Sequence, residues 1–317
     1  MTTPVLLDVD TGVDDALALL LAVRHPELDL RAVTCVAGNA PVDQVVRNTC
    51  IVLDAAGAGD VPVAQGAARP LIEPPRAARH VHGEDGMADL GLPPSGRRPV
   101  DGHAIALMAH VFRTSTEPVT LVALGPLTNV ALLLRVHPDS AAAIARVVMV
   151  GGASSGGNAT AVAEFNIWHD PEAAAIVLGS GLPITMYGLD VFYDVTLDRA
   201  QAAALSAGPD SAARLAGALM THQLDRFGDS LATIGDAGAV AAVVDPAALT
   251  VGRHPLRVEL AGTWTRGQTV VDRRPWAGDQ QHDPYGAAAP SVEIALGVDA
   301  DRYRTMFLAA MGVRADG

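Results

Sequence analysis

Short runs of β-branched residues alternate along this chain with longer segments in which Ala and Leu recur at helical spacing. That alternation is typical of a parallel sheet whose strands are joined by helices covering both of its faces. Strands are expected at residues 5–9, 30–36, 119–123, 147–150, 184–187 and 292–295, and helices at 16–23, 42–56, 127–134, 171–178, 237–244 and 300–311. We therefore predict an α/β fold with an open, mostly parallel, doubly wound sheet, in a single domain spanning residues 1–317.

Two segments depart from this alternation. Residues 64–100 are rich in Gly, Pro, Arg and His and have neither a helical nor a strand period. A stretch of that length inside a compact domain is more often a functional loop than a linker, so we predict an active-site loop there. Nearer the C-terminus, strand-like pieces at 257–260 and 268–271 predict a hairpin followed by a loop, over residues 257–290.

The composition excludes several classes of protein. The 22 basic residues, all of them Arg, face 35 acidic ones, and a net charge of −13 argues against a nucleic-acid surface. The lack of lysine excludes a Walker-type phosphate loop and Schiff-base chemistry. Cys35 and Cys50 cannot build a disulfide framework, and the first residues contain neither a basic leader nor an apolar span. We expect a cytoplasmic protein with no membrane partner.

Four aspartates fall within eight residues where the first predicted strand ends, in the segment LLDVDTGVDDA. Asp8 and Asp10 should share a face of the strand, while Asp14 and Asp15 open a helix whose N-terminus favours each charge by about 0.3–1 kcal/mol. Two unit charges about 4 Å apart repel by about 4 kcal/mol at an effective dielectric of about 20, so the helix does not offset the crowding. A hard divalent cation, calcium or magnesium, would do so. The plainer alternative is that Asp14 or Asp15 caps the helix and the others face water.

Seven segments, taken in order, resemble the nucleoside hydrolases, a family that cleaves ribonucleosides to free base and ribose. They are DVDTGVDDALALLLA at 8–22, VAGNA at 36–40, HGEDG at 82–86, ALGPLTNVA at 123–131, VGGASSGGNATAVAEFNIWHDPEAA at 150–174, GDAGAVAAVVDP at 235–246 and RGQTVVD at 266–272. A single Asp-x-Asp-x-Gly would be a weak signal, whereas this ordered set covers nearly the whole chain. The resemblance implies hydrolysis of the N-glycosidic bond through an oxocarbenium-like transition state.

The resemblance also implies a calcium site. The carboxylates of Asp10, Asp15 and Asp236 and the backbone carbonyl of Leu124 would hold the ion, completed by water and two ribose hydroxyls. Calcium lowers the pKa of a bound water and aligns it, and Asp10 is the expected general base. The implied partner is a small-molecule ribonucleoside, and the implied assembly a homodimer or homotetramer.

The ribose side follows from the same resemblance. Asp14, Asn39 and Asn166 match positions that hold the ribose and its attacking water, which makes Asn39 a catalytic as well as a binding residue. Asn158 and Glu164 match positions that bind the 5′-hydroxyl. The alternative for Asn158, Glu164 and Asn166 is that these polar side chains only cap loops.

The match departs from the family pattern at two positions, of which Val150, where the family often has methionine, is a mild change in packing. Many members of the family have a histidine directly before the last metal-binding aspartate, where it assists departure of the base, and here that position is Gly235. His82, in a loop expected near the base, has the best case as the replacement acid, although a lone loop histidine is often only a surface residue. The other candidates are His222, Asp225, Asp229, His282 and Asp283.

Several aromatic side chains could stack on the base, and Phe227 is the first choice because it lies near the predicted mouth of the site. The alternatives are Trp168, Trp264, Trp276 and Tyr193. Packing in the core or at the rim is the default role for each of them. The preferred base therefore stays open.

Two other functions stay in competition. LLDVDTG also fits the start of haloacid-dehalogenase-like phosphatases, with Asp8 as nucleophile, Asp10 as acid and magnesium as metal, but the chain has no lysine to bind phosphate. Gly235 allows the second alternative, a catalytically silent nucleoside- or ribose-binding protein that keeps the calcium and hydroxyl ligands. Phosphate release from phosphate esters would favour the first, and nucleoside binding without sugar release the second.

Ribonucleosides should be preferred over 2′-deoxyribonucleosides. A site built to hydrogen-bond the ribose hydroxyls rejects a substrate that lacks one by as much as about 10⁴-fold, because buried polar groups are then left unpaired. We expect a difference of that order in kcat/KM between a ribonucleoside and its 2′-deoxy analogue. Comparable values for the two would contradict this expectation.

Overall fold

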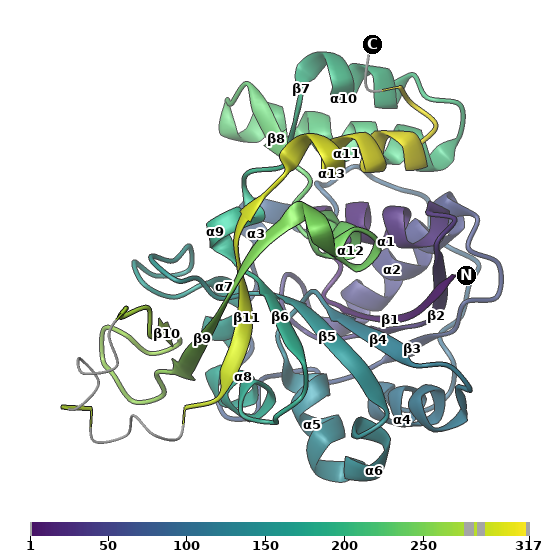
Figure 1. Ribbon diagram of the computed structural model, residues 1–317. Helices are drawn as coiled ribbons and strands as arrows, with labels where there is room; N and C mark the ends of the chain where they lie inside the picture. The colour runs from purple at the N-terminus through teal and green to yellow at the C-terminus, as the bar shows by residue number, and fades with distance from the viewer. Residues whose placement is uncertain (1, 276–281, 284–288, 315–317) are drawn as a thin grey trace.

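The computed structural model describes residues 2–275, 282–283 and 289–314. Within them lies a nine-stranded sheet with the strand order β10-β9-β11-β6-β5-β4-β1-β2-β3 (Figure 1). In chain order the strands are β1 (Thr3–Val9), β2 (Leu28–Cys35), β3 (Val63–Gln65), β4 (Val119–Ala123), β5 (Ile144–Val150), β6 (Ile184–Tyr187), β9 (Leu249–Val258), β10 (Thr269–Val271) and β11 (Ser291–Val298). The strands from β11 to β3 pair in parallel, and β9 and β10 add antiparallel pairs at one edge. The predicted open, mostly parallel sheet is confirmed.

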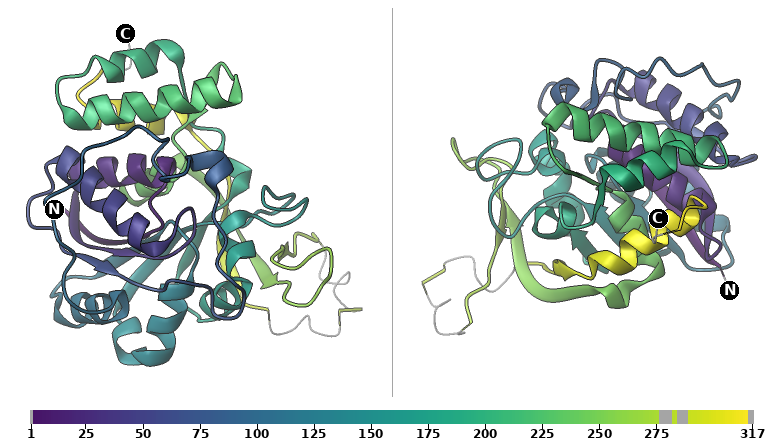
Figure 2. Two further views of the ribbon diagram at one scale, coloured as in Figure 1. Left: turned by 180° about the vertical axis from the view of Figure 1, so that it is seen from behind. Right: turned by 90° about the horizontal axis from the view of Figure 1, so that it is seen from above.

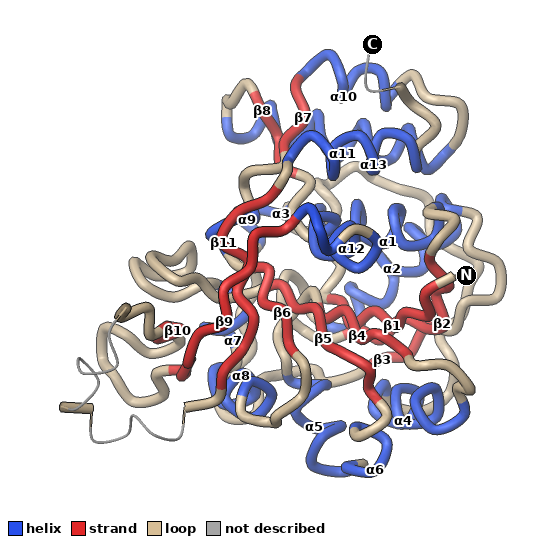
Figure 3. The backbone as a smooth tube through the Cα atoms, viewed as in Figure 1, coloured by secondary structure: helices blue, strands red, loops and turns tan. Residues whose placement is uncertain are grey.

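Helices cover both faces of the sheet, as a doubly wound fold requires (Figures 1 and 3). One face carries α1 (Val13–Arg24), α2 (Val42–Ala56) and α12 (Ala237–Val244), and the other carries α4 (Ala104–Thr114), α5 (Thr128–Val136), α6 (Pro138–Ala141) and α8 (Pro171–Leu178). Each face has its own buried apolar cluster. Side chains that alternate along β1 divide between the two, since Leu7 belongs to the cluster with α1 and Leu6 to the cluster with α5.

A further group of helices lies on the side of the sheet that carries α1 and α2 (Figure 2). It contains α10 (Arg199–Ser206), α11 (Ser211–Phe227) and α13 (Ala300–Ala310), with the short antiparallel pair β7 (Thr196–Asp198) and β8 (Leu231–Thr233) beside them. The sequence pattern predicts α13 but not α10 or α11. The carboxylate of Asp210 caps the start of α11, and Gly228, at φ 66°, ends it. These helices are rich in Ala, and α11 packs against α1 and α2 while α10 packs against α11.

The two irregular segments are only partly as predicted. Residues 64–100 contain the end of β3 and the one-turn helix α3 (Arg79–His82), and α4, which follows them, is not predicted. The hairpin pairs β9 with β10, but β9 begins at Leu249, well before the predicted 257–260. Residues 276–281 and 284–288 of the loop after it lie outside the described part of the chain. The remaining elements are α7 (Phe165–His169), α9 (Leu189–Phe192) and a 3₁₀ turn at Pro246–Ala248. No described helix combines the length and apolar character that crossing a bilayer requires.

A buried polar cluster joins β1, β2 and α5. Asp8 is 1% exposed, and its Oδ1 accepts hydrogen bonds from Thr34 Oγ1 at 2.7 Å and Asn129 Nδ2 at 2.8 Å. Burial raises the pKa of Asp8 to about 7 in spite of these donors. Asn129 Nδ2 also donates to the carbonyl of Cys35, and Asn129 Oδ1 accepts the N–H of Ala67. Asn129 thus satisfies three buried polar groups at once.

Replacing Asn129 with Leu should destabilise the fold. The substitution nearly conserves volume, but it removes the hydrogen bonds that Asn129 makes to the Cys35 carbonyl and the Ala67 N–H and leaves Asp8 Oδ1 with Thr34 as its donor. Loss of a hydrogen bond by a buried group costs about 1–3 kcal/mol. We expect a loss of about 3–5 kcal/mol in the free energy of unfolding, measured by urea denaturation. Ser115→Ala, at an exposed loop hydroxyl, should change it by less than about 0.5 kcal/mol. A loss below about 1 kcal/mol for Asn129→Leu would contradict this account.

Candidate active site

The strand order reverses between β1 and β4, because the chain runs outward from β1 through β2 to β3 and then places β4 on the other side of β1. In open α/β sheets, ligands bind beyond the carboxyl ends of the strands at such a point. A cavity of about 800 Å³ lies there. The predicted residues that line it are Asp10, Asp14, Asn39, His82, Leu124, Asn158, Glu164, Asn166, Phe227 and Asp236. Of the predicted site residues, only Asp15 is absent from the lining, and it is fully buried directly behind it.

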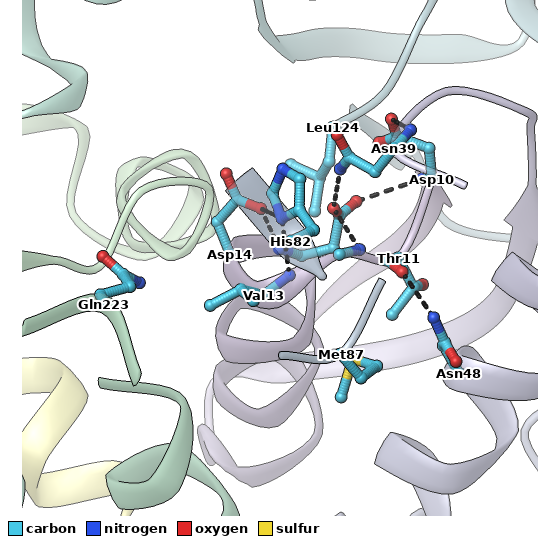
Figure 4. Close-up of polar contacts among 12 residues, drawn as sticks. Asp10, Thr11, Val13, Asp14, Asn39, Asn48, His82, Met87, Leu124 and Gln223 are labelled. Carbon is cyan, nitrogen blue, oxygen red and sulfur yellow. Dashed lines mark hydrogen bonds and ion pairs between the residues drawn. The ribbon is translucent and has the colours of Figure 1, made fainter. Parts of the chain in front are cut away.

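Asp10 follows β1, where two glycines leave room for its carboxylate. A Cβ at Gly38 would lie 2.1 Å from Oδ2, and one at Gly125 would lie 2.6 Å from Oδ1. The backbone N–H of Asn39 donates to Oδ2 at 2.8 Å (Figure 4). Burial, and then the charge of Asp15, raises the pKa of Asp10 well above its usual range. The backbone therefore fixes this carboxylate in place although its surroundings disfavour its charge.

Two helix starts bring further carboxylates beside Asp10. Asp14 and Asp15 lie in the first turn of α1, and Asp236 directly precedes α12. One oxygen from each of these three side chains lies within 4.8 Å of the other two. Asp15 also accepts the N–H groups of Gly12 at 3.0 Å and Asp10 at 3.1 Å. The family resemblance predicts that Asp14 binds the ribose. The structure places it close enough to Asp15 and Asp236 for the three carboxylates to share one cation.

Charge within this group is poorly compensated. Burial raises the pKa of Asp14 and Asp15 to about 6, and the charge of Asp14 adds to the effect on Asp15. Burial, followed by the charges of Asp14 and Asp15, raises the pKa of Asp236 well above its usual range. Among the ion-pair contacts of the described residues, the one to this group is that of His82 Nδ1, 3.7 Å from Asp14 Oδ1. A bound divalent cation fits both the oxygen donors and the missing positive charge.

Leu124 and Asn166 connect two strand ends at the cavity. The N–H of Leu124 donates to the carbonyl of Asp8 at 2.8 Å, and the Leu124 carbonyl accepts from Asn166 Nδ2 at 2.7 Å. Asn166 Nδ2 also donates to the carbonyl of Val150 at 3.2 Å. Because both amide hydrogens are used, the side-chain oxygen of Asn166 is the group left to accept a hydrogen bond from a ligand.

Glu164 and Asn158 do act as caps, as the alternative interpretation expects. The carboxylate of Glu164 accepts three backbone N–H groups, including that of Gly152 at 2.9 Å, and thereby caps α7. Asn158 Oδ1 accepts the N–H of Phe165 at 2.8 Å. Both side chains also line the cavity, so the same bonds that cap the loop hold these groups toward a ligand.

His82, at the end of α3, is 6% exposed. Its Nδ1 accepts the N–H of Val13, the first residue of α1, at 3.1 Å (Figure 4). Burial lowers the pKa of His82 to about 4, although the charge of Asp15 opposes the shift. A neutral ring that accepts at Nδ1 carries its hydrogen at Nε2. His82 can therefore donate a hydrogen bond through Nε2 but does not carry a second proton near neutral pH.

The space in front of Gly235 is already filled. Its φ of 50° lies in the left-handed region, and an added Cβ would lie 2.8 Å from Asp14 Cβ and 2.9 Å from Phe192 Cζ. The histidine expected from the family resemblance would thus need the Phe192 ring to move. The Phe192 ring occupies the space that a histidine side chain at position 235 would need.

The other candidates for the acid differ in whether they line the cavity. Asp229 lines the cavity. Asp225 pairs instead with Arg199 at 2.9 Å. The remaining candidates, none of them among the described residues lining the cavity, are His222, His282 and Asp283.

Phe227 lines the cavity at the end of α11 and is 51% exposed. Trp168 and Tyr193 also line it, whereas Trp264 is 88% exposed in the hairpin and Trp276 lies outside the described residues. All three lining rings are placed to contact a base or the cavity mouth.

Phe192 and Gln223 are among the lining residues that sequence reasoning missed. Gln223 lies across the cavity from His82 and Asp14, and its Nε2 donates to the carbonyl of Thr233 at 3.2 Å (Figure 4). It precedes Phe227 by four residues on α11, a spacing that puts both on one face. That spacing would have signalled Gln223 only if α11 had been predicted.

The phosphatase alternative needs Asp8 as an accessible nucleophile. Asp8 is instead buried in the polar cluster with Thr34 and Asn129 and does not line the cavity. The structure therefore gives no support to that chemistry.

Comparison with known proteins identifies the family. A profile described as inosine-uridine preferring nucleoside hydrolase matches residues 5–305. The chain belongs to this family. The pyrimidine-specific ribonucleoside hydrolase RihA of Citrobacter koseri is 42% identical over 277 residues, which are 86% of this chain and 89% of that protein. RihA of an Enterobacter species is 43% identical over 86% of this chain and 88% of its own length.

Solved structures of nucleoside hydrolases share the fold over nearly the whole chain. The plant nucleoside hydrolase PpNRh1 has a TM-score of 0.90 at 29% identity and covers 98% of this chain and 99% of its own. A purine-preferring ribonucleoside hydrolase from Gardnerella vaginalis has a TM-score of 0.87 at 29% identity and covers 98% of each chain. This nucleoside hydrolase is thus an enzyme that acts on N-glycosyl bonds of small-molecule ribonucleosides.

Replacing Gly125 with Ala should abolish activity without unfolding the protein. The new Cβ would lie 2.6 Å from Asp10 Oδ1, so the carboxylate must move. We expect kcat on ribonucleosides to fall at least about 100-fold, because displacement of a catalytic group by about 1 Å has effects of that size. Gly96→Ala, whose Cβ meets open space, should keep wild-type kcat, and circular dichroism should be unchanged for both. If Gly125→Ala kept more than about half of the wild-type activity, that result would argue against Asp10 as the general base.

Proposed function

We propose that this ribonucleoside hydrolase uses calcium and water to cleave the N-glycosidic bond through an oxocarbenium-like transition state. The observation that carries the proposal is the group of crowded carboxylates at the end of β1 and the starts of α1 and α12. Such a group needs a cation to compensate its charge. The polar side chains beside it suit a polyhydroxyl ligand, which the same cation could bind. Oxygen ligands favour calcium over zinc.

The proposed calcium ligands are the carboxylates of Asp10, Asp15 and Asp236 and the carbonyl of Leu124. All are hard oxygen donors, of which Asp10, Leu124 and Asp236 line the cavity and Asp15 lies buried beside Asp10. Asp14 lies within 4.8 Å of Asp15 and Asp236 and so is within reach of the same ion. When bound, the ion would lower the pKa of a coordinated water and hold two ribose hydroxyls.

Asp10 is the proposed general base. Gly38, Gly125 and the N–H of Asn39 hold its carboxylate at the cavity wall, where it can take a proton from the attacking water. The side-chain oxygen of Asn166 is free to accept a second hydrogen from that water or from a hydroxyl. Together these groups orient the nucleophile on one face of the ribose.

The remaining polar groups are proposed to bind the sugar. Asp14 and Asn39 lie beside the calcium position and suit the ring hydroxyls, while Asn158 and Glu164 suit the 5′-hydroxyl. Hydrogen bonds to three hydroxyls provide binding energy that can distort the ring toward the transition state. The caps that fix Glu164 and Asn158 reduce the entropy lost on binding.

On the other side of the bond, His82 Nε2 is the proposed donor to the departing base, and Phe227 the proposed stacking surface. His82 would stabilise developing negative charge as a neutral hydrogen-bond donor, which suits its low pKa. The RihA relatives, named pyrimidine-specific, are more similar in sequence than the purine-preferring structure. This supports uridine and cytidine as preferred substrates. The family resemblance further supports a cytoplasmic homodimer or homotetramer.

Purified protein should release reducing sugar from ribonucleosides. We expect release from a panel of uridine, cytidine, inosine, adenosine and guanosine, abolished by chelation and restored by calcium. Asp10→Ala should lower kcat at least about 1000-fold, because it removes both a metal ligand and the base. Release that survives chelation would refute calcium dependence, and tight nucleoside binding without release would favour the silent binding protein.

Replacing His82 with Ala should impair departure of the base. We expect kcat to fall by about 10–100-fold on inosine and by much less on a riboside with an activated leaving group, such as p-nitrophenyl riboside. His110→Ala, at an exposed position on α4, should affect neither substrate. Equal losses on both substrates would remove His82 as the donor.

A further inference from the structure

Residues 78–88, which carry His82, are held by several separate elements. The N–H of Ala78 donates to the carbonyl of Asn39, and Val13 donates to the ring of His82. Asn48 Nδ2, from α2, donates to the carbonyl of Asp85 at 2.9 Å. These three contacts all come from the sheet and from the helices next to it.

A fourth contact comes from α11. Arg226 Nε donates to the backbone carbonyl of His80 at 2.7 Å, and Nη2 of the same guanidinium donates to that oxygen as well. His80 lies in the one-turn helix α3, which is too short to provide this carbonyl with an intrahelical partner. Among the hydrogen bonds of the described residues, these are the ones that join α11 to α3.

The two joined elements form facing walls of the cavity. His80, Val81 and His82 line it from α3, while Gln223 and Phe227 line it from α11. Arg226 directly precedes Phe227, and the helix ends at Gly228. The buried side of α11 packs on α1 and α2, but its last turn is exposed from Asp225 onward, so this packing does not by itself set the distance between that turn and α3.

We propose that Arg226 is a positioning residue that sets the distance between α3 and α11 and so the width of the base side of the cavity. The inference rests on the proposed function, in which His82 and Phe227 contact the base from opposite walls. Arg226 itself does not line the cavity. It acts through the carbonyl of His80, while the ribose side, which is built on strand ends and capped loops, is independent of it.

The test compares Arg226→Met, which keeps the apolar stem and removes the donors, with two other variants. Arg214→Met is the matched control, because Arg214 lies on the same helix and donates to the carbonyl of Gly208 at 3.3 Å, away from α3. Arg226→Lys keeps the charge and can donate to the carbonyl, so it should recover part of any loss.

We expect amide exchange of the hydrogen-bonded groups of Val81, His82, Gly83 and Ala88 to become about tenfold faster in Arg226→Met, the effect of losing one hydrogen bond to a charged group. KM for uridine should rise about 5–10-fold, as expected for lost ground-state contacts. The N–H of Val13 still holds the ring of His82, so kcat should change by less than about twofold. The inhibition constant of free ribose, which needs only the ribose side, should stay unchanged. Arg214→Met should leave all four quantities at wild-type values.

Unchanged exchange in Arg226→Met, or an equal increase in Arg214→Met, would overturn the proposal. A parallel rise in the KM for uridine and the inhibition constant of ribose would also overturn it, since that result indicates general loosening of the cavity. Faster exchange with an unchanged KM for uridine would show that the hydrogen bonds of Arg226 to the His80 carbonyl do not set the width of the base side of the cavity. If the wild-type protein splits no ribonucleoside, the proposed function fails, and the exchange measurement still decides whether Arg226 holds α3.

Discussion

Repulsion among buried carboxylates is the constraint on which the rest of this site depends. Asp10, Asp15 and Asp236 are almost fully buried, and Asp14 adjoins them, yet they are met by helix starts and N–H groups and by no charged cation among the described residues, since the His82 ring beside Asp14 is neutral. Burial raises the pKa of all four, which shows that the protein alone does not stabilise their charge. A cation resolves that conflict, and the same positive charge can then serve a water and a diol.

The arrangement holds because the carboxylates are attached to rigid parts of the fold. Asp10 follows a central parallel strand, and Asp15 and Asp236 belong to the first turns of two helices that pack on the same face of the sheet. Gly38 and Gly125 let neighbouring backbone approach the Asp10 carboxylate closely. A site that must hold like charges together needs such support, because flexible side chains would separate.

The two sides of the cavity are built differently. The ribose side consists of strand ends and capped loops whose polar groups are held by backbone hydrogen bonds, as Glu164 and Asn166 illustrate. The base side consists of a one-turn helix and the end of α11, held together by Arg226. At Gly235 the Phe192 ring and Asp14 leave no room for a side chain, so the proposed donor to the base comes from the α3 wall. Reaction chemistry and base recognition therefore depend on parts of the fold that can vary separately.

The sequence alone was enough to determine the parallel α/β sheet, the acidic cluster at the end of β1 and most of the polar side chains that line the cavity. Strand periodicity and the local spacing of Asp10, Asp14 and Asp15 are short-range properties, and the ordered family motifs added the distant positions. The sequence pattern did not predict α10 and α11, whose buried sides are decided by packing against each other and, for α11, against α1 and α2. Gln223 and Arg226, both on α11, therefore stayed hidden, as did Phe192 on α9. Asp8 was expected beside Asp10 but belongs to a separate polar cluster, since the positions of Thr34 and Asn129 relative to it exist only after β2 and α5 have packed around β1.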